Sequence, residues 1–200
     1  MIMKKKESTL VNMVVVLFVI TLVAGLTLGF VNDLTLEPKA QAQLAKKVSA
    51  LEKVLPPFDN DPVSGVVLVK AEGVKDSVEV YPAFRDGSFV GAAVTGASEK
   101  GYSGLVKLLV GFEPDGKIKN IEVLEQKETP GLGTKMKGDR FLKQFRGKNP
   151  ASFNLKAAKD GGEVDALAGA TISTRAFGEA TQQAYRVFME QKDRIAVTDN

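Results

Sequence analysis

The chain has 200 residues, a formal net charge of +3, and neither cysteine nor histidine. Their absence excludes thiol catalysis, cysteine-ligated iron–sulfur clusters, histidine-ligated haem and Ser-His-Asp hydrolysis, and no disulfide can hold the fold. Residues 1–9 carry three Lys and one Glu, a net +2, which leaves +1 for residues 10–200. The bulk of the chain lacks a basic excess, so we expect no nucleic-acid partner, and we expect no metal site.

An uncharged apolar run occupies residues 10–31, directly after this basic tip. A helix of that length crosses a hydrocarbon core of about 30 Å. Lys4, Lys5 and Lys6 precede the run, and the positive-inside rule places residues 1–9 in the cytoplasm. We therefore expect a single transmembrane helix with the rest of the chain outside.

A cleaved signal peptide is the alternative interpretation of the same run. Ala40-Gln41-Ala42 offers the small-x-small pattern of a cleavage site. The apolar run is longer than the usual signal core of about 7 to 15 residues. Its length favours retention as a membrane anchor.

Residues 32–61 are expected to form a connecting helix and linker. After Pro38, apolar residues recur at helical spacing while charged residues fill the other faces. Pro56-Pro57 ends this pattern. The apolar stripe favours packing on the chain's own globular domain, and docking on a neighbouring membrane subunit is the alternative. The stripe consists of Leu44, Val48, Leu51 and Leu55.

Residues 62–190 are expected to form one α+β domain of antiparallel hairpins and helices, followed by a tail at residues 191–200. Two pairs of apolar runs are each separated by Asp-Gly, which accepts the positive φ of a tight turn. Each pair therefore predicts a β-hairpin. The expected strands are residues 78–84 and 89–95 around Asp86-Gly87, and residues 105–112 and 118–123 around Asp115-Gly116.

Two helices are expected in the second half of the domain. Phe141, Leu142 and Phe145 mark a short one, and a long amphipathic helix begins at about Ile172. Thr171 then lies at the N-terminus of the long helix, at the end of the segment Asp165-Ala166-Leu167-Ala168-Gly169-Ala170-Thr171.

This position of Thr171 suits a phosphate. Free N–H groups and the positive end of the helix dipole gather at a helix N-terminus. The small residues 168–170 let a bulky group approach the backbone. The alternative is that Thr171 or Ser173 merely caps the helix, as such residues often do.

Two further segments belong with this one. Gln126-Lys127-Glu128-Thr129-Pro130-Gly131-Leu132-Gly133 contains a Pro-Gly turn that, taken alone, is typical of an ordinary loop. Gly101-Tyr102-Ser103-Gly104 is the second. Together with the segment that ends at Thr171, they resemble the FMN-binding domain family of membrane redox complexes. The resemblance covers roughly residues 62–190.

The chain is most similar to the G subunits of Rnf electron-transport complexes, and the related C subunits of sodium-pumping quinone reductases are usually longer. Two features depart from the family pattern: Ala168 stands where Ser is common, and no His precedes the Glu-Thr-Pro run. Neither departure affects the hydroxyl of Thr171. The resemblance implies that a flavin transferase recognises the segment and joins FMN through its phosphate to Thr171, as a phosphoester.

The resemblance also implies roles for individual residues. Glu128 and Thr129 are expected to make polar contacts to the isoalloxazine, and Leu132 and Tyr102 to cover its apolar face. Asp165 is expected to be needed by the attaching enzyme. The remaining expected residues of the cofactor site are Gly131, Gly133, Gly169, Ala170 and Ser173.

The function that this resemblance implies is electron transfer by a membrane-anchored subunit of an ion-translocating ferredoxin:NAD⁺ oxidoreductase. The chemistry belongs to the flavin, and no catalytic residue is expected in the chain. The implied partners are the other membrane subunits, the membrane itself and the flavin transferase, with the domain on the periplasmic side of the bacterial inner membrane. Two alternatives remain open: an FMN subunit of a sodium-pumping NADH:quinone reductase, and a non-catalytic exported binding module.

Overall fold

The computed structural model describes residues 10–70 and 77–197. By compactness the chain divides into two units, Met1–Lys46 and Lys47–Asn200. The described part of the first unit is residues 10–46 of helix α1, and the whole helix is Leu10–Val54. The expected cytoplasmic tip, residues 1–9, lies outside the described residues.

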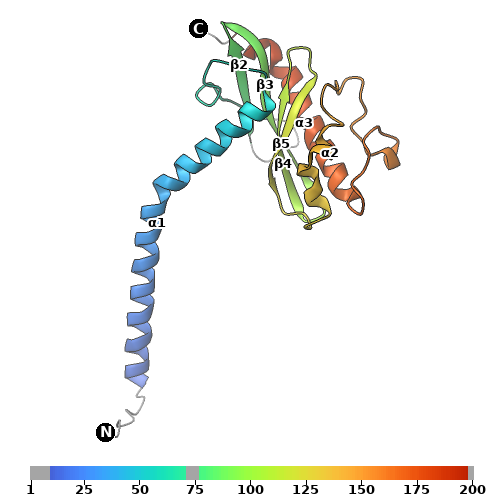
Figure 1. Ribbon diagram of the computed structural model, residues 1–200. Coiled ribbons are helices and arrows are strands. Elements are labelled where there is room, and N and C mark those ends of the chain that lie inside the picture. The colour runs from blue at the N-terminus through green and yellow to red at the C-terminus, as the bar shows by residue number, and fades with distance from the viewer. Residues whose placement is uncertain (1–9, 71–76, 198–200) are drawn as a thin grey trace. The chain divides into compact units, whose positions relative to one another are not determined.

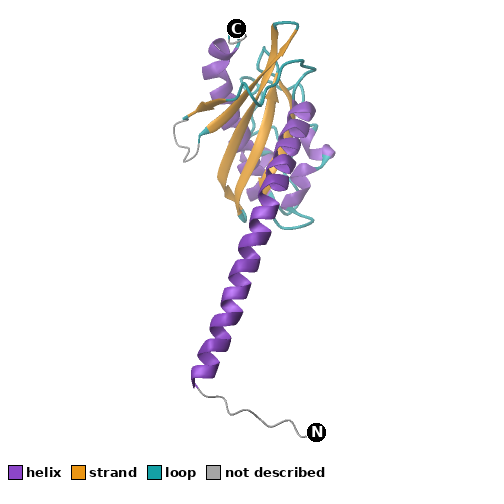
Figure 2. Ribbon diagram, turned by 90° about the vertical axis from the view of Figure 1, so that its left-hand side faces the viewer, coloured by secondary structure: helices purple, strands orange, loops and turns teal. Residues whose placement is uncertain are grey.

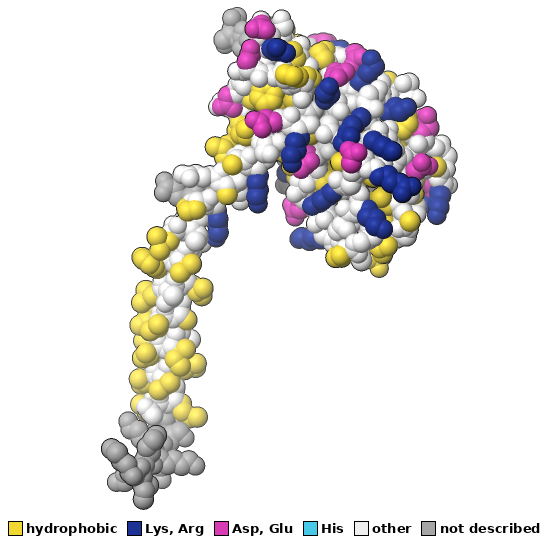
Figure 3. Space-filling view, in the orientation of Figure 1, with side chains coloured by type: hydrophobic (Ala, Val, Ile, Leu, Met, Phe, Trp, Pro, Cys, Tyr) yellow, Lys and Arg dark blue, Asp and Glu magenta, His cyan; other side chains and the backbone are white. Residues whose placement is uncertain are grey.

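The N-terminal part of α1 is apolar enough to cross a membrane. The candidate span is Leu10–Thr35, and within it a stretch of 18 residues has a mean hydropathy of 2.8 and no residue buried inside the protein. Figure 3 shows apolar side chains along the whole visible face of this part of the helix. An isolated helix that exposes so many apolar side chains requires an apolar environment, because water would otherwise solvate that surface.

The apolar run and the connecting segment form one continuous helix. Pro38 lies inside α1, which continues to Val54. A proline removes one backbone hydrogen bond and crowds the preceding turn, but a long helix can pass through it with a local distortion. The helix ends before Pro56-Pro57, as expected, since a residue that precedes proline is disfavoured in helical conformation.

The second unit is built on one antiparallel sheet of five strands in the order β1-β2-β3-β4-β5 (Figure 1). Both expected hairpins are confirmed, and their Asp-Gly turns lie between β2 and β3 and between β4 and β5. The sequence did not indicate that Gly101–Gly104 joins β3 to β4, or that a short edge strand precedes β2. The strands are β1 (Val67–Val69), β2 (Val78–Arg85), β3 (Ser88–Gly101), β4 (Gly104–Phe112) and β5 (Ile118–Gln126).

Helix α3, Thr171–Ile195, covers one face of the sheet, and residues 47–54 of α1 lie across the other face (Figures 1 and 2). Alternate strand residues therefore enter two different cores. Gly96 and Gly111 let the helices approach closely, because a Cβ at these positions would lie 2.1 Å from the carbonyl oxygen of Ala180 and 1.9 Å from that of Val54.

The apolar stripe of the connecting segment is only partly used in this packing. Leu51 and Leu55 are buried in the core beneath the sheet, which confirms packing on the chain's own domain for this part. Leu44 and Val48 are exposed. Docking of these two residues on a neighbouring subunit therefore stays a prediction.

The chain between β5 and α3 forms a layer of short elements around the start of α3. These are η1 (Gly133–Lys137), the expected short helix α2 (Asp139–Leu142) and η2 (Ala158–Asp160). Phe141 and Phe145 pack on Phe177, each with ring centroids 5.0 Å from it. This aromatic cluster packs the segment around α2 against α3.

Candidate functional site

Thr171 is the first residue of α3, as expected. Gly169 makes the turn into the helix with φ of +72°, a conformation that side chains other than glycine rarely adopt. Thr174 fixes the turn, because its hydroxyl donates to the Ala170 carbonyl at 3.0 Å and accepts from the Leu167 N–H at 3.1 Å. The segment before the helix is therefore held in one conformation.

Neither Thr171 nor Ser173 caps this helix. The residue at the N-cap position is Ala170, and no side chain there accepts a hydrogen bond from the helix. The first hydrogen bond of the helix is from the Thr174 N–H to the Ala170 carbonyl, at 3.1 Å. Within the described residues, the N–H groups of Thr171, Ile172 and Ser173 have no acceptor, so three donors remain for an anion.

A cavity of about 500 Å³ opens at this helix N-terminus. That volume is within the range of small-molecule and cofactor sites. Three segments that are distant in the sequence form its walls: the β3–β4 turn, the loop after β5 and the start of α3. The lining residues are Tyr102, Thr129, Leu132, Gly133, Gly169, Ala170, Thr171, Ile172 and Ser173.

Eight of these nine residues were expected from the sequence, and Ile172 was missed. Ile172 is 45% exposed although it is large and apolar. Tyr102 and Leu132, at 69% and 41% exposed, form the rest of an apolar rim. The available signal was an apolar side chain next to Thr171 that lies off the buried stripe of an amphipathic helix.

The other three expected residues do not line the cavity. Gly131 lies in the exposed turn of the loop and donates its N–H to Thr134 Oγ1 at 3.0 Å. Asp165 is exposed, and its backbone N–H donates to Gln144 Oε1 at 2.8 Å. Glu128 is buried, at 4% exposed, behind the cavity wall rather than on it.

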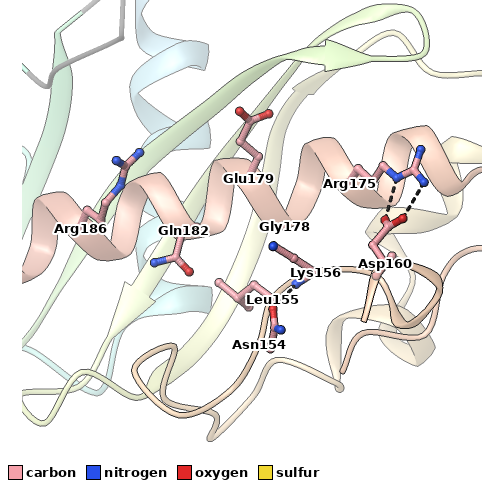
Figure 4. Close-up of a pocket in the computed structure, with 10 residues that line it drawn as sticks. Asn154, Leu155, Lys156, Asp160, Arg175, Gly178, Glu179, Gln182 and Arg186 are labelled. Carbon is pink, nitrogen blue, oxygen red and sulfur yellow. Dashed lines mark hydrogen bonds and ion pairs between the residues drawn. The ribbon is translucent and has the colours of Figure 1, made fainter. Parts of the chain in front are cut away.

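A larger cavity, of about 620 Å³, lies farther along α3 (Figure 4). Both of its carboxylates are already paired with cations. Arg175 donates twice to Asp160, with both distances 2.7 Å, and this pairing lowers the pKa of the Asp160 carboxyl. Lys100, at 2.6 Å, lowers the pKa of the Glu179 carboxyl. None of the expected site residues lines this cavity.

Comparison with known proteins assigns the family. The model of the FMN-binding domain matches residues 101–186, which include every residue that lines the smaller cavity. The G subunit of the ion-translocating oxidoreductase complex of Aliivibrio fischeri strain ES114 is 35% identical, over 98% of this chain and 95% of that protein. The chain belongs to this family of G subunits. The corresponding protein of Photorhabdus laumondii is 37% identical over 78% of both chains.

The fold of this G-type subunit is shared with a solved structure. The crystal structure of NqrC from Shewanella oneidensis matches with a TM-score of 0.51 and 23% identity, over 68% of this chain and 74% of that one. This similarity confirms the α+β fold. It carries no further argument about function, because the sequence identity is low.

Proposed function

We propose that this chain is the electron-transfer subunit of an Rnf-type ion-translocating ferredoxin:NAD⁺ oxidoreductase, with FMN joined through its phosphate to the hydroxyl of Thr171. The observation that carries the proposal is the state of Thr171. Thr171 lines a cofactor-sized cavity and lies at a helix N-terminus with three N–H groups free, and its hydroxyl makes no hydrogen bond within the described residues.

The residues of the cavity fit the parts of FMN. The free N–H groups of residues 171–173 and the helix dipole would hold the phosphate. Tyr102, Leu132 and Ile172 offer apolar surface to the ring system, and Thr129 offers a hydroxyl. When bound, the flavin supplies the electron-transfer chemistry, while the protein supplies position and electrostatics.

Attachment requires an activated flavin donor, because a hydroxyl does not displace water from a free phosphate unaided. In the proposed reaction, a flavin transferase forms the bond between Thr171 Oγ1 and the phosphorus of a flavin dinucleotide. The pyrophosphate bond breaks, the nucleotide leaves, and the hydroxyl proton passes to a base of the transferase. Asp165 lies exposed on the same segment but outside the cavity, where the transferase can reach it.

The membrane arrangement is part of the proposal. Leu10–Thr35 would anchor the chain in the bacterial inner membrane, and Lys4, Lys5 and Lys6 would hold its N-terminus in the cytoplasm. The flavin domain would then work on the periplasmic side with the other membrane subunits. A phosphatase that is active only outside the cytoplasm should be active when fused after Asn200, and an inactive fusion would contradict this topology.

The attachment is tested by co-expression with a flavin transferase, followed by a denaturing gel under ultraviolet light. The wild-type band should fluoresce, because only a covalent bond survives denaturation. Thr171→Val should be dark while it still folds, since the side chain keeps its shape and loses only the hydroxyl. Thr129→Val is the matched control, because it removes another hydroxyl of the cavity and should keep the covalent flavin. A fluorescent Thr171→Val, or a wild-type chain that stays colourless, would contradict the proposal.

A further inference from the structure

Glu128 lies in the loop after β5 and contacts both other segments that form the flavin cavity. It is 4% exposed and follows β5 by two residues, where its N–H donates to Gln126 Oε1 at 2.6 Å. Among the acidic side chains that the structure describes, it alone is buried. A buried carboxylate is costly unless its oxygens accept hydrogen bonds.

Both oxygens of this carboxylate accept a hydrogen bond. Oε1 accepts from the N–H of Ser103, at 3.0 Å, and Oε2 accepts from the hydroxyl of Ser173, at 2.5 Å. Ser103 follows Tyr102 in the β3–β4 turn, and Ser173 lies in the first turn of α3, two residues after Thr171. One side chain thus connects the loop after β5 to both other walls of the cavity.

The carboxylate of Glu128 lies close to the cavity. Gly133 and Ser173 line the cavity, and Glu128 packs directly behind both. A Cβ at Gly133 would lie 2.6 Å from Glu128 Cβ and 2.8 Å from Oε2, and one at Gly101 would lie 2.6 Å from Oε1. The carboxylate of Glu128 is therefore closely packed against residues that line the cavity.

We propose that Glu128 is a positioning residue that holds the Tyr102 turn and the first turn of α3 around the flavin, and that its negative charge lowers the reduction potential of that flavin. This inference rests on the proposed function. Reduction adds electron density to a flavin, and a fixed negative charge nearby opposes that addition. Water is largely excluded around Glu128, so the charge is weakly screened.

Two variants of the full-length, flavin-loaded protein in detergent test the electrostatic role and the positioning role separately. Glu128→Gln removes the charge and keeps the shape, and it should shift the midpoint potential in the positive direction. Ser173→Ala removes the hydroxyl donor and keeps the charge. It should lower the fluorescence anisotropy of the flavin, while its potential stays closer to wild type. Glu125→Gln is the matched control, because it removes the same charge from an exposed residue of β5.

An unchanged potential in Glu128→Gln, or equal shifts in Glu128→Gln and Glu125→Gln, would overturn the electrostatic role. A shift in Ser173→Ala of the same sign and size as in Glu128→Gln would also overturn it, because loosening of the wall would then explain both. Unchanged anisotropy in Ser173→Ala would overturn the positioning role, even if Glu128→Gln fails to load flavin. Loss of flavin from the wild type would instead contradict the proposed function.

Discussion

Two cavities lie along the same helix, and the smaller one has the features of a cofactor site. The groove near Arg175 has a volume of about 620 Å³, but its carboxylates already bind Arg175, Lys100 and Ser98. The cavity at Thr171 has about 500 Å³ and leaves a hydroxyl and three backbone donors without acceptors within the described residues. Open N–H groups at a helix N-terminus, with the positive end of the helix dipole, indicate an anionic ligand better than volume does.

The two cavities should respond differently to Gly→Ala substitutions, and after the complete loss of flavin from Thr171→Val this is the largest effect that we expect. Gly133→Ala places a Cβ against Glu128 and Ser173, at 2.6 and 2.7 Å, so the cavity wall must move and most of the covalent flavin should be lost. Gly178→Ala, in the groove, places a Cβ 2.4 Å from the Leu155 carbonyl oxygen. It should destabilise the fold by about 1–3 kcal/mol.

Flavin content per folded molecule, together with thermal unfolding, checks this prediction. The folded fraction of Gly178→Ala should carry as much flavin as the wild type. If both variants lose flavin in proportion to their loss of stability, the two cavities would not differ as we propose.

A smaller effect is expected at the apolar rim of the cavity at Thr171. Leu132→Ala removes part of the surface that would cover the ring system, so iodide should quench the flavin fluorescence more strongly than in the wild type. Gln182→Ala, in the groove, serves as the control and should leave quenching unchanged. Equal quenching of Leu132→Ala and the wild type would place the ring system away from Leu132.

The smallest effect concerns the ion pair of the groove. The hydrogen bond from Arg175, and then its charge, hold the pKa of Asp160 below its ordinary value of 3.8. The pair therefore stabilises the fold above this ordinary value, and the contribution is lost as the pH falls through the lowered pKa. Asp160→Asn should unfold at a slightly lower temperature than the wild type at neutral pH, by a small margin because the pair is exposed.

The difference between Asp160→Asn and the wild type should vanish in strong acid. Flavin content should be the same in both at neutral pH. A loss of flavin in Asp160→Asn would mean that the groove belongs to the cofactor site after all.

Local patterns in the sequence predicted much of this architecture. The Asp-Gly turns predicted the two hairpins, and the amphipathic pattern that begins at about Ile172 placed Thr171 at a helix start. The uninterrupted course of α1 through Pro38 was not predictable from local propensity, because a proline in a long helix can either break or bend it. The edge strand β1 has only three residues, too few for a periodic pattern.

The sequence predicted most of the residues that line the cavity, but not how they are arranged. Family motifs indicated eight of its nine lining residues, but the position of Glu128 depends on contacts across long stretches of sequence. Its partners Ser103 and Ser173 are separated from it by 25 and 45 residues. An acidic side chain next to a Pro-Gly loop suggests a ligand contact. Only the close packing of Gly101 and Gly133 against Glu128 shows that this side chain lies behind the cavity wall.

The most direct test of the central claim is peptide mapping of the denatured wild-type protein after co-expression with a flavin transferase. Trypsin cuts after Lys159 and Arg175, so Thr171, Ser173 and Thr174 fall in one peptide, residues 160–175. Mass spectrometry should find this peptide heavier by one FMN less one water, and fragmentation should place the added mass on Thr171. An unmodified peptide, or added mass on Ser173 or Thr174, would contradict the account.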